Sequence, residues 1–114
     1  MDAESIRDLF GAVGPVRIRR MFGGQGLFVG ELMFGLEAGG ELYLKTDPES
    51  AGAFEAEGSA RFTYRRQGKP ASLGYWRLPD RALDDPEEAG RWARLAVEAA
   101  RRAAAAKAAR RRKR

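Results

Sequence analysis

The sequence contains neither cysteine nor histidine among its 114 residues. Without cysteine, the chain has no disulfide, no thiolate metal site and no cysteine nucleophile. Without histidine, it also lacks the side chain that most often acts as a general base near neutral pH and most often binds zinc. An enzyme would have to use carboxylates, lysine, tyrosine or serine, so the sequence favours a function other than catalysis.

Long apolar runs are also missing. No run approaches the roughly 18 residues that a membrane-spanning helix needs. Residues 1–4 include two acidic residues and lead into an amphipathic pattern, which is not typical of a signal peptide. We therefore expect a cytoplasmic protein with no membrane partner. Its 44% hydrophobic and 32% charged residues are ordinary for one soluble globular domain.

The formal net charge of +5 is concentrated near the C-terminus. Residues 101–114 hold eight of the 21 Lys and Arg residues and no acidic residue, which leaves 13 basic against 16 acidic residues in residues 1–100. We predict an α+β domain over residues 1–100 and a basic, Ala/Arg-rich tail over residues 101–114. The tail should extend the preceding helix and fray beyond about Ala103, with residues 110–114 disordered, because alanine buries little apolar surface.

Periodic patterns predict helices at both ends of the domain and strands between them. Apolar residues at i, i+3, i+4 and i+7 from Ile6 predict a helix over residues 2–13. Asp47-Pro48 predicts the start of a short helix, and Asp85-Pro86, followed by Glu88, predicts that of a long one. Alternating patterns predict six strands, over residues 16–22, 27–29, 32–37, 42–45, 61–66 and 71–78.

These elements follow one another in the order α-β-β-β-β-α-β-β-α. The loops between the first four strands are too short for parallel crossovers, so these strands must form an antiparallel meander. The order therefore predicts an α+β fold in which helices pack on an antiparallel β-sheet.

A glycine-rich stretch, Arg-Arg-Met-Phe-Gly-Gly-Gln-Gly over residues 19–26, joins the first two strands. It lacks the Lys-Ser/Thr ending of a phosphate-binding loop, and a strand pattern follows it, so no helix N-terminus is available to hold a phosphate. We predict that residues 23–26 form a tight turn. The alternative is a loop that binds an anion or a partner.

Clusters of cations are the candidate binding residues, and no catalytic, cofactor-binding or metal-binding residue is predicted. The acidic pairs within residues 84–88 are better explained by the start of a helix. The candidate partner-binding residues form two clusters. They are Arg17, Arg19 and Arg20 in the first predicted strand, and Arg65, Arg66 and Lys69 around the link between the last two predicted strands. The candidate nucleic-acid-binding residues of the tail are Arg101, Arg102, Lys107, Arg110, Arg111, Arg112, Lys113 and Arg114.

Each cluster also has a less specific interpretation. The first three arginines could form the solvated face of an edge strand. The cluster of Arg65, Arg66 and Lys69 lies among aromatic residues, and together they could bind single-stranded nucleic acid. The strand spacing of the aromatic residues instead favours their packing in the sheet. The tail could attract phosphate backbones or merely keep the protein soluble; an anionic membrane is less favoured, because alanines give no large apolar face.

Several blocks of the sequence resemble the N-terminal domain of the TfoX/Sxy family. In order along residues 19–100, they are RMFGGQGL (20–27), MFGL (33–36), ELYLK (41–45), FTY (62–64), GKP (68–70), YWRLP (75–79) and LDDPE (83–87). The resemblance implies an α+β fold with an antiparallel sheet and no enzymatic activity. It also implies a regulatory role of the kind that two-domain members play in natural competence, with the cyclic-AMP receptor protein. This chain has its basic tail where those members have a second, helical domain.

We therefore expect a small regulatory or protein-interaction module that binds a protein partner, needs no cofactor and does not act by catalysis. The sequence defines neither the partner nor the oligomeric state. One alternative is a direct, nonspecific nucleic-acid-binding protein that uses the basic tail. The other, less favoured, is an uncharacterised enzyme.

Overall fold

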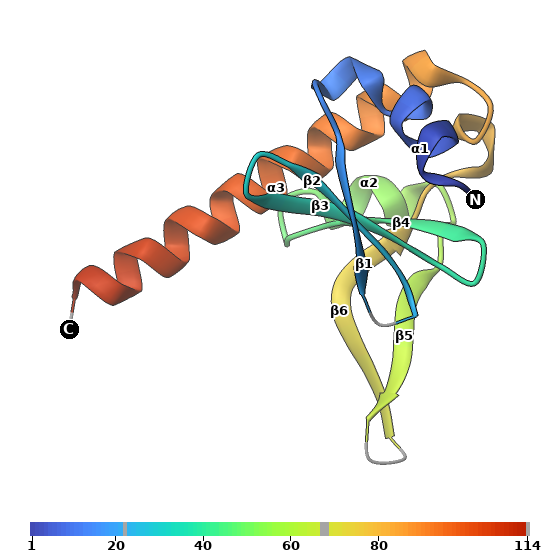
Figure 1. The fold of residues 1–114 in the computed structure, drawn as a ribbon. Helices are drawn as coiled ribbons and strands as arrows, with labels where there is room; N and C mark the ends of the chain where they lie inside the picture. The colour runs from blue at the N-terminus through green and yellow to red at the C-terminus, as the bar shows by residue number, and fades with distance from the viewer. Residues whose placement is uncertain (22, 67–68, 114) are drawn as a thin grey trace.

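The computed structural model describes residues 1–21, 23–66 and 69–113, with the side chains of these residues except 64–73. In these residues six strands form one antiparallel sheet, and three α-helices share a hydrophobic core with it (Figure 1). The strand order in the sheet is β1-β2-β3-β4-β6-β5. The predicted α+β class and the predicted order of helices and strands are confirmed, with two short 3-10 helices in addition.

The first four strands form the predicted antiparallel meander. The loop between the third and fourth strands consists of Gly39 and Gly40, with φ angles of 60° and 83°. Both angles match the left-handed conformation of a tight hairpin turn. The four strands are β1 (Arg17–Met21), β2 (Gly24–Val29), β3 (Leu32–Ala38) and β4 (Glu41–Lys45).

The glycine-rich stretch differs from the predicted four-residue turn over residues 23–26. Gly23 has a turn conformation, with φ of 75°, but the next three residues belong to β2 and pair with β1. Phe22 lies outside the described residues. A side chain at Gly24 would overlap the carbonyl oxygen of Glu37 on β3. Glycine at this position is therefore explained by the close approach of a neighbouring strand.

A short helix, α2 (Ala51–Ala56), leads from the meander to a hairpin of β5 (Arg61–Arg66) and β6 (Lys69–Arg77). β6 returns to pair with β4, which places β5 at the edge of the sheet. The helix begins later than predicted, because a turn intervenes after Asp47. The Asp47 carboxylate accepts the backbone N–H of Ser50 at 3.0 Å, and the Ser50 hydroxyl accepts the Asp47 N–H at 3.1 Å.

The N-terminal segment forms α1 (Ala3–Leu9) and a 3-10 helix, η1 (Gly11–Val13), instead of one continuous helix. The helix begins at a capping residue: the Asp2 carboxylate accepts the backbone N–H of Ser5 at 2.8 Å. The apolar face of this segment packs into the core, where the Phe10 and Phe34 rings meet edge to face with centroids 5.7 Å apart.

The C-terminal helix, α3 (Pro86–Arg112), follows a second 3-10 helix, η2 (Asp80–Ala82), and packs across β3 and β4. Its start is as predicted, since the Asp85 carboxylate accepts the backbone N–H groups of the second and third helical residues. Trp92 on this helix lies against Phe54 of α2, with ring centroids 4.7 Å apart, and Trp76 of β6 belongs to the same core.

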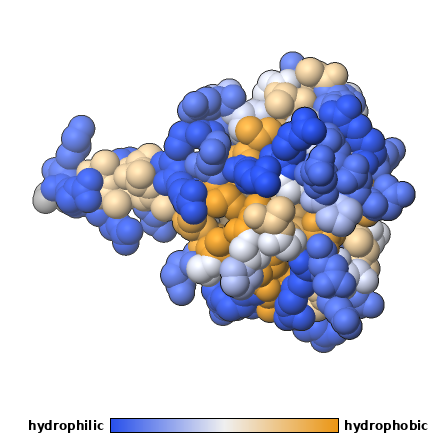
Figure 2. Space-filling view, turned by 90° about the horizontal axis from the view of Figure 1, so that it is seen from above, coloured by the Kyte–Doolittle hydropathy of each residue, from blue (hydrophilic) through white to orange (hydrophobic). Residues whose placement is uncertain are grey.

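The last part of α3 projects away from the rest of the molecule (Figure 1). Figure 2 shows it as a narrow arm with many hydrophilic residues. The basic segment is helical as far as Arg112, and fraying of its last turns in solution stays a prediction. Within the described residues, no helix combines the length and apolar character that crossing a membrane requires.

Candidate binding site

β1 lies at one edge of the sheet and carries three of the predicted arginines. Ile18 packs against the hydrophobic core. Because alternate residues of a strand project to the same face, Arg20 shares the side of Ile18, whereas Arg17 and Arg19 project to the opposite side. The edge strand therefore presents cations in two directions.

Arg17 is held against the sheet. Its guanidinium carbon lies 4.8 Å from the centre of the Phe28 ring, and its Nη2 donates a hydrogen bond to the carbonyl oxygen of Gly30 at 3.1 Å. A cation over an aromatic face is a stabilising contact. Arg17 is therefore at least partly occupied in supporting the β1–β2 hairpin.

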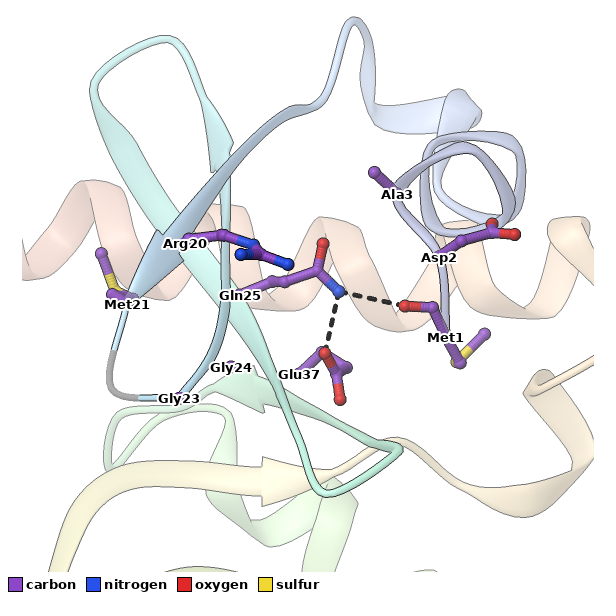
Figure 3. Close-up of a pocket in the computed structure, with 9 residues that line it drawn as sticks. All are labelled: Met1, Asp2, Ala3, Arg20, Met21, Gly23, Gly24, Gln25 and Glu37. Atoms are coloured by element: carbon purple, nitrogen blue, oxygen red, sulfur yellow. Dashed lines mark hydrogen bonds between the residues drawn. The ribbon is translucent and has the colours of Figure 1, made fainter.

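Arg19 and Arg20 are exposed, and neither forms a hydrogen bond or an ion pair with the described part of the chain. Arg20 lines a pocket of about 800 Å³ between the N-terminal segment and the first three strands (Figure 3). Both cations are thus free to meet an external anionic group. The residues around the pocket are Met1, Asp2, Ala3, Arg20, Met21, Gly23, Gly24, Gln25 and Glu37.

The inner wall of the pocket is a hydrogen-bonded pair on neighbouring strands. Gln25 Nε2 donates to Glu37 Oε1 at 2.8 Å and to the Met1 carbonyl oxygen at 3.0 Å (Figure 3). The other carboxylate oxygen of Glu37 accepts the Gly40 N–H at 2.9 Å. The hydrogen bond from Gln25, together with that from Gly40, holds the pKa of Glu37 below its usual value although the side chain is buried. This carboxylate therefore stays ionised near neutral pH, and each of its two oxygens accepts a hydrogen bond.

The second predicted cluster lies at the other edge of the sheet from β1. Arg65 and Arg66 belong to β5 and Lys69 to β6, and Arg66 pairs with Lys69 in the register of the hairpin. Their side chains fall outside the described ones. The two predicted clusters therefore lie on strands that are not neighbours in the sheet.

Arg102, predicted as part of a nucleic-acid-binding tail, is bound to the body of the protein. Its Nε lies 2.6 Å from Asp47 Oδ2 and 3.2 Å from Glu49 Oε2, and its Nη2 lies 3.1 Å from Asp47 Oδ1. Sequence reasoning missed this contact, because the partners are 55 residues apart. The tail residues without an ion pair among the described residues are Arg101, Lys107, Arg110, Arg111, Arg112 and Lys113; Arg114 lies outside them.

The described residues of the candidate site offer exposed cations and hydrogen-bonding groups. They contain no group of three acidic side chains arranged to hold a metal ion. Burial raises the pKa of the Tyr75 phenol to about 12, so this group stays protonated near neutral pH. Within the described part of the chain, the arginines of β1 and the projecting end of α3 carry exposed cations that have no acidic partner.

The sequence matches the family model of the TfoX N-terminal domain over residues 8–100, and the chain belongs to this family. It is also 27% identical over 74 residues to Protein Sxy of Escherichia coli strain K12. That similarity covers 65% of this chain but 35% of the relative, so the chain spans about a third of the length of Protein Sxy. The match to the family model, over residues 8–100, includes all six strands, whereas the basic end of α3 lies beyond it.

Proposed function

We propose that this protein is a small regulatory module that acts by binding a partner protein, with an acidic segment of the partner lying along β1. The observation that carries the proposal is the pair of exposed cations, Arg19 and Arg20, on an edge strand, with no acidic partner among the described residues. Membership of the TfoX N-terminal domain family supports a role like that of the competence regulators, which would place the protein in the cytoplasm.

An edge strand suits this kind of recognition for two reasons. Its outer backbone N–H and C=O groups can pair with an added strand, which provides affinity. Guanidinium groups bind carboxylates through charge-assisted hydrogen bonds, which provides specificity. Because Arg19 and Arg20 project to opposite faces, they would contact successive acidic side chains of one extended segment. Binding of this kind needs no catalytic group.

The test uses a defined probe, an extended peptide in which pairs of adjacent glutamates are separated by single valines, and an otherwise identical peptide with glutamine in place of glutamate. Adjacent glutamates project to opposite faces of an extended strand, as Arg19 and Arg20 do. We expect the double variant Arg19→Glu/Arg20→Glu to bind the acidic peptide at least about tenfold more weakly than the wild type, since two charge-assisted contacts are replaced by repulsion. Isothermal titration calorimetry measures the affinity. Thermal unfolding checks that the variant is folded.

The matched control reverses two exposed arginines of α3, in the variant Arg94→Glu/Arg101→Glu. It changes the net charge by the same amount and should leave the affinity for the acidic peptide nearly unchanged. Equal weakening by both double variants, or equal binding of the glutamine peptide, would reject β1 as the docking surface.

A second candidate function is nonspecific binding of nucleic acid through the basic end of α3. The specific observation in its favour is that this basic helix projects from a body with a net charge of −3 over residues 1–100 (Figure 1). Removal of residues 104–114 keeps Arg102 and its partners, so the fold should persist while most binding to generic duplex DNA is lost. Strong, salt-dependent binding by the truncated protein would instead assign the contact to the body.

A further inference from the structure

We propose that residues 101–113, here called the α3 extension, bind duplex DNA as a continuous helix lying in the major groove. This proposal rests on the second candidate function and specifies the form of nucleic acid and the way it is held. Three properties of the α3 extension carry the inference: the distribution of its charges, its width and its position relative to the body.

The cations surround the α3 extension instead of marking one face. Successive residues of an α-helix are about 100° apart around its axis. Four consecutive cations, Arg110 to Lys113, therefore cover most of the circumference, and Arg101 and Lys107 lie further back along the helix. All of these side chains are exposed. A partner that neutralises them together must present negative charge on more than one side, as the two phosphate walls of a groove do.

The α3 extension is also narrow where it leaves the body. Six of the seven residues between Arg102 and Arg110 are alanine. A helix with side chains is about 10–12 Å across and the major groove of B-DNA is about 12 Å wide, so a slim helix can enter it deeply. Alanine methyl groups suit contact with thymine methyl groups there. The deep, narrow major groove of duplex RNA does not admit such a helix.

The body keeps the α3 extension free for this contact. Arg102 is anchored to Asp47 and Glu49, which fixes the base of the α3 extension beside α2. Residues 1–100 carry a net charge of −3, so phosphates repel the body while they attract the projecting helix. The body should therefore remain outside the groove and the helix should enter it from its C-terminal end.

Two other partners fit these observations less well. A helix that lies on a membrane needs large apolar side chains opposite its charges. From Glu98 onward the only apolar residue type is alanine. An acidic protein surface would neutralise cations on one side of the helix and leave those on the other side unpaired. Anionic vesicles and an acidic peptide therefore serve as competing probes in the test.

The experiment measures binding of the full chain to a mixed-sequence DNA duplex of about 20 base pairs over a series of salt concentrations. Six cations of the α3 extension are free of ion pairs among the described residues, which predicts a slope of log K against log salt near −5, at about −0.9 per phosphate contact. An RNA duplex of the same sequence should bind at least about tenfold more weakly. Methyl green, which occupies the major groove, should compete, and netropsin, which occupies the minor groove, should not.

The decisive variant is Ala105→Pro, which interrupts the helix and keeps every charge. Ala105→Ser is its matched control, because serine is tolerated inside a helix. We expect the proline variant to bind DNA at least about tenfold more weakly and the serine variant to bind like the wild type. Circular dichroism and thermal unfolding verify that both variants keep the folded body.

The outcomes separate this inference from the function on which it rests. If the wild type does not bind duplex DNA, both fail. If it binds but the proline variant and the RNA duplex bind equally well, nonspecific attraction stands and the groove-bound helix is rejected. Tighter binding to vesicles of anionic lipid or to the acidic peptide than to DNA would also reject the inference, in favour of those partners.

Discussion

Arg102 near the end of α3 holds the carboxylate of Asp47 with two nitrogens, Nε at 2.6 Å from Oδ2 and Nη2 at 3.1 Å from Oδ1. Asp47 also accepts the backbone N–H of Ser50 in the turn before α2. One carboxylate thus connects two helices that are far apart in the sequence. The contact fixes Arg102, at the base of the α3 extension, to the folded body.

The Asp47–Arg102 ion pair should stabilise the fold at neutral pH, since two guanidinium nitrogens hold one carboxylate, but only modestly, since solvent screens it. Arg102→Ala should lower the free energy of unfolding, and Arg101→Ala, which removes an exposed arginine from the preceding position, should change it less. Urea unfolding measures both. A similar loss in the two variants would show that the pair has no special role.

The same pair predicts a pH dependence. The hydrogen bonds from Arg102 and, to a smaller extent, from Ser50 lower the pKa of Asp47 from 3.8 to about 2. A carboxyl group with a lowered pKa stabilises the fold above its unfolded pKa, and the effect is lost as the pH falls through the folded value. The stability difference between the wild type and Arg102→Ala should therefore be complete above about pH 4 and shrink towards pH 2. A difference that did not change over this range would contradict the assignment.

Gly24→Ala should lower the free energy of unfolding by about 2 kcal/mol or more, because the added methyl group overlaps the Glu37 carbonyl oxygen and two strands must move apart. Gly52→Ala is the control. Apart from its chain neighbours and the backbone of α2 itself, no heavy atom of the described residues lies within 4 Å of a methyl group at that position, and alanine favours a helix over glycine by up to about 1 kcal/mol. Thermal unfolding distinguishes the two. Unchanged stability of the Gly24 variant would refute close strand packing as the reason for glycine.

Gln25→Ala should raise the pKa of Glu37. The variant removes the side-chain hydrogen bond that favours the ionised form, while burial, which disfavours it, remains. The stability that ionised Glu37 provides should then be lost at a higher pH during acidification. Carboxyl carbon chemical shifts followed by NMR report the titration, and the pKa of Asp47 should stay about 2 as an internal control. No change at Glu37 would show that the pair in the pocket wall is not formed in solution.

Asp85→Ala should lower the free energy of unfolding by about 1 kcal/mol, the usual effect of losing an N-cap. Its carboxylate accepts the N–H groups of Glu87 and Glu88 at 3.1 and 3.2 Å. Asp84→Ala removes a neighbouring exposed acid that caps nothing among the described residues and should have little effect. Chemical unfolding of both variants at the same pH measures the difference, and equal effects would assign it to general charge.

Local chemistry explains which parts of the fold could be predicted. The capped start of α3 and the short loops of the meander depend on neighbours in the sequence, and both were predicted. The glycine-rich stretch was predicted as a turn because its true constraint, the approach of Glu37, comes from another strand. The insertion of β6 between β4 and β5 likewise depends on pairing across many residues.

In the candidate site too, the features that depend on nearby residues were predicted, and those that depend on distant contacts were missed. The arginines of β1 were found from the sequence, because charge clusters are visible there. The pocket beside Arg20 was missed, since it requires the register that brings Gln25 opposite Glu37 and the return of the N-terminal segment. The role of Arg102 was also missed, because its charge gave no sign of its partner.

The pairing of β4 with β6 has a consequence for the order in which the chain folds. Leu44 pairs with Trp76, so 31 intervening residues must be brought back before that contact can form. The hairpins of the meander join strands separated by short loops and therefore close at a smaller cost in chain entropy. We expect the meander to form early and the pairing of β4 with β6 to form late. Substitutions that weaken the pairing of β4 with β6 should then mainly accelerate unfolding, whereas substitutions in the meander should slow folding.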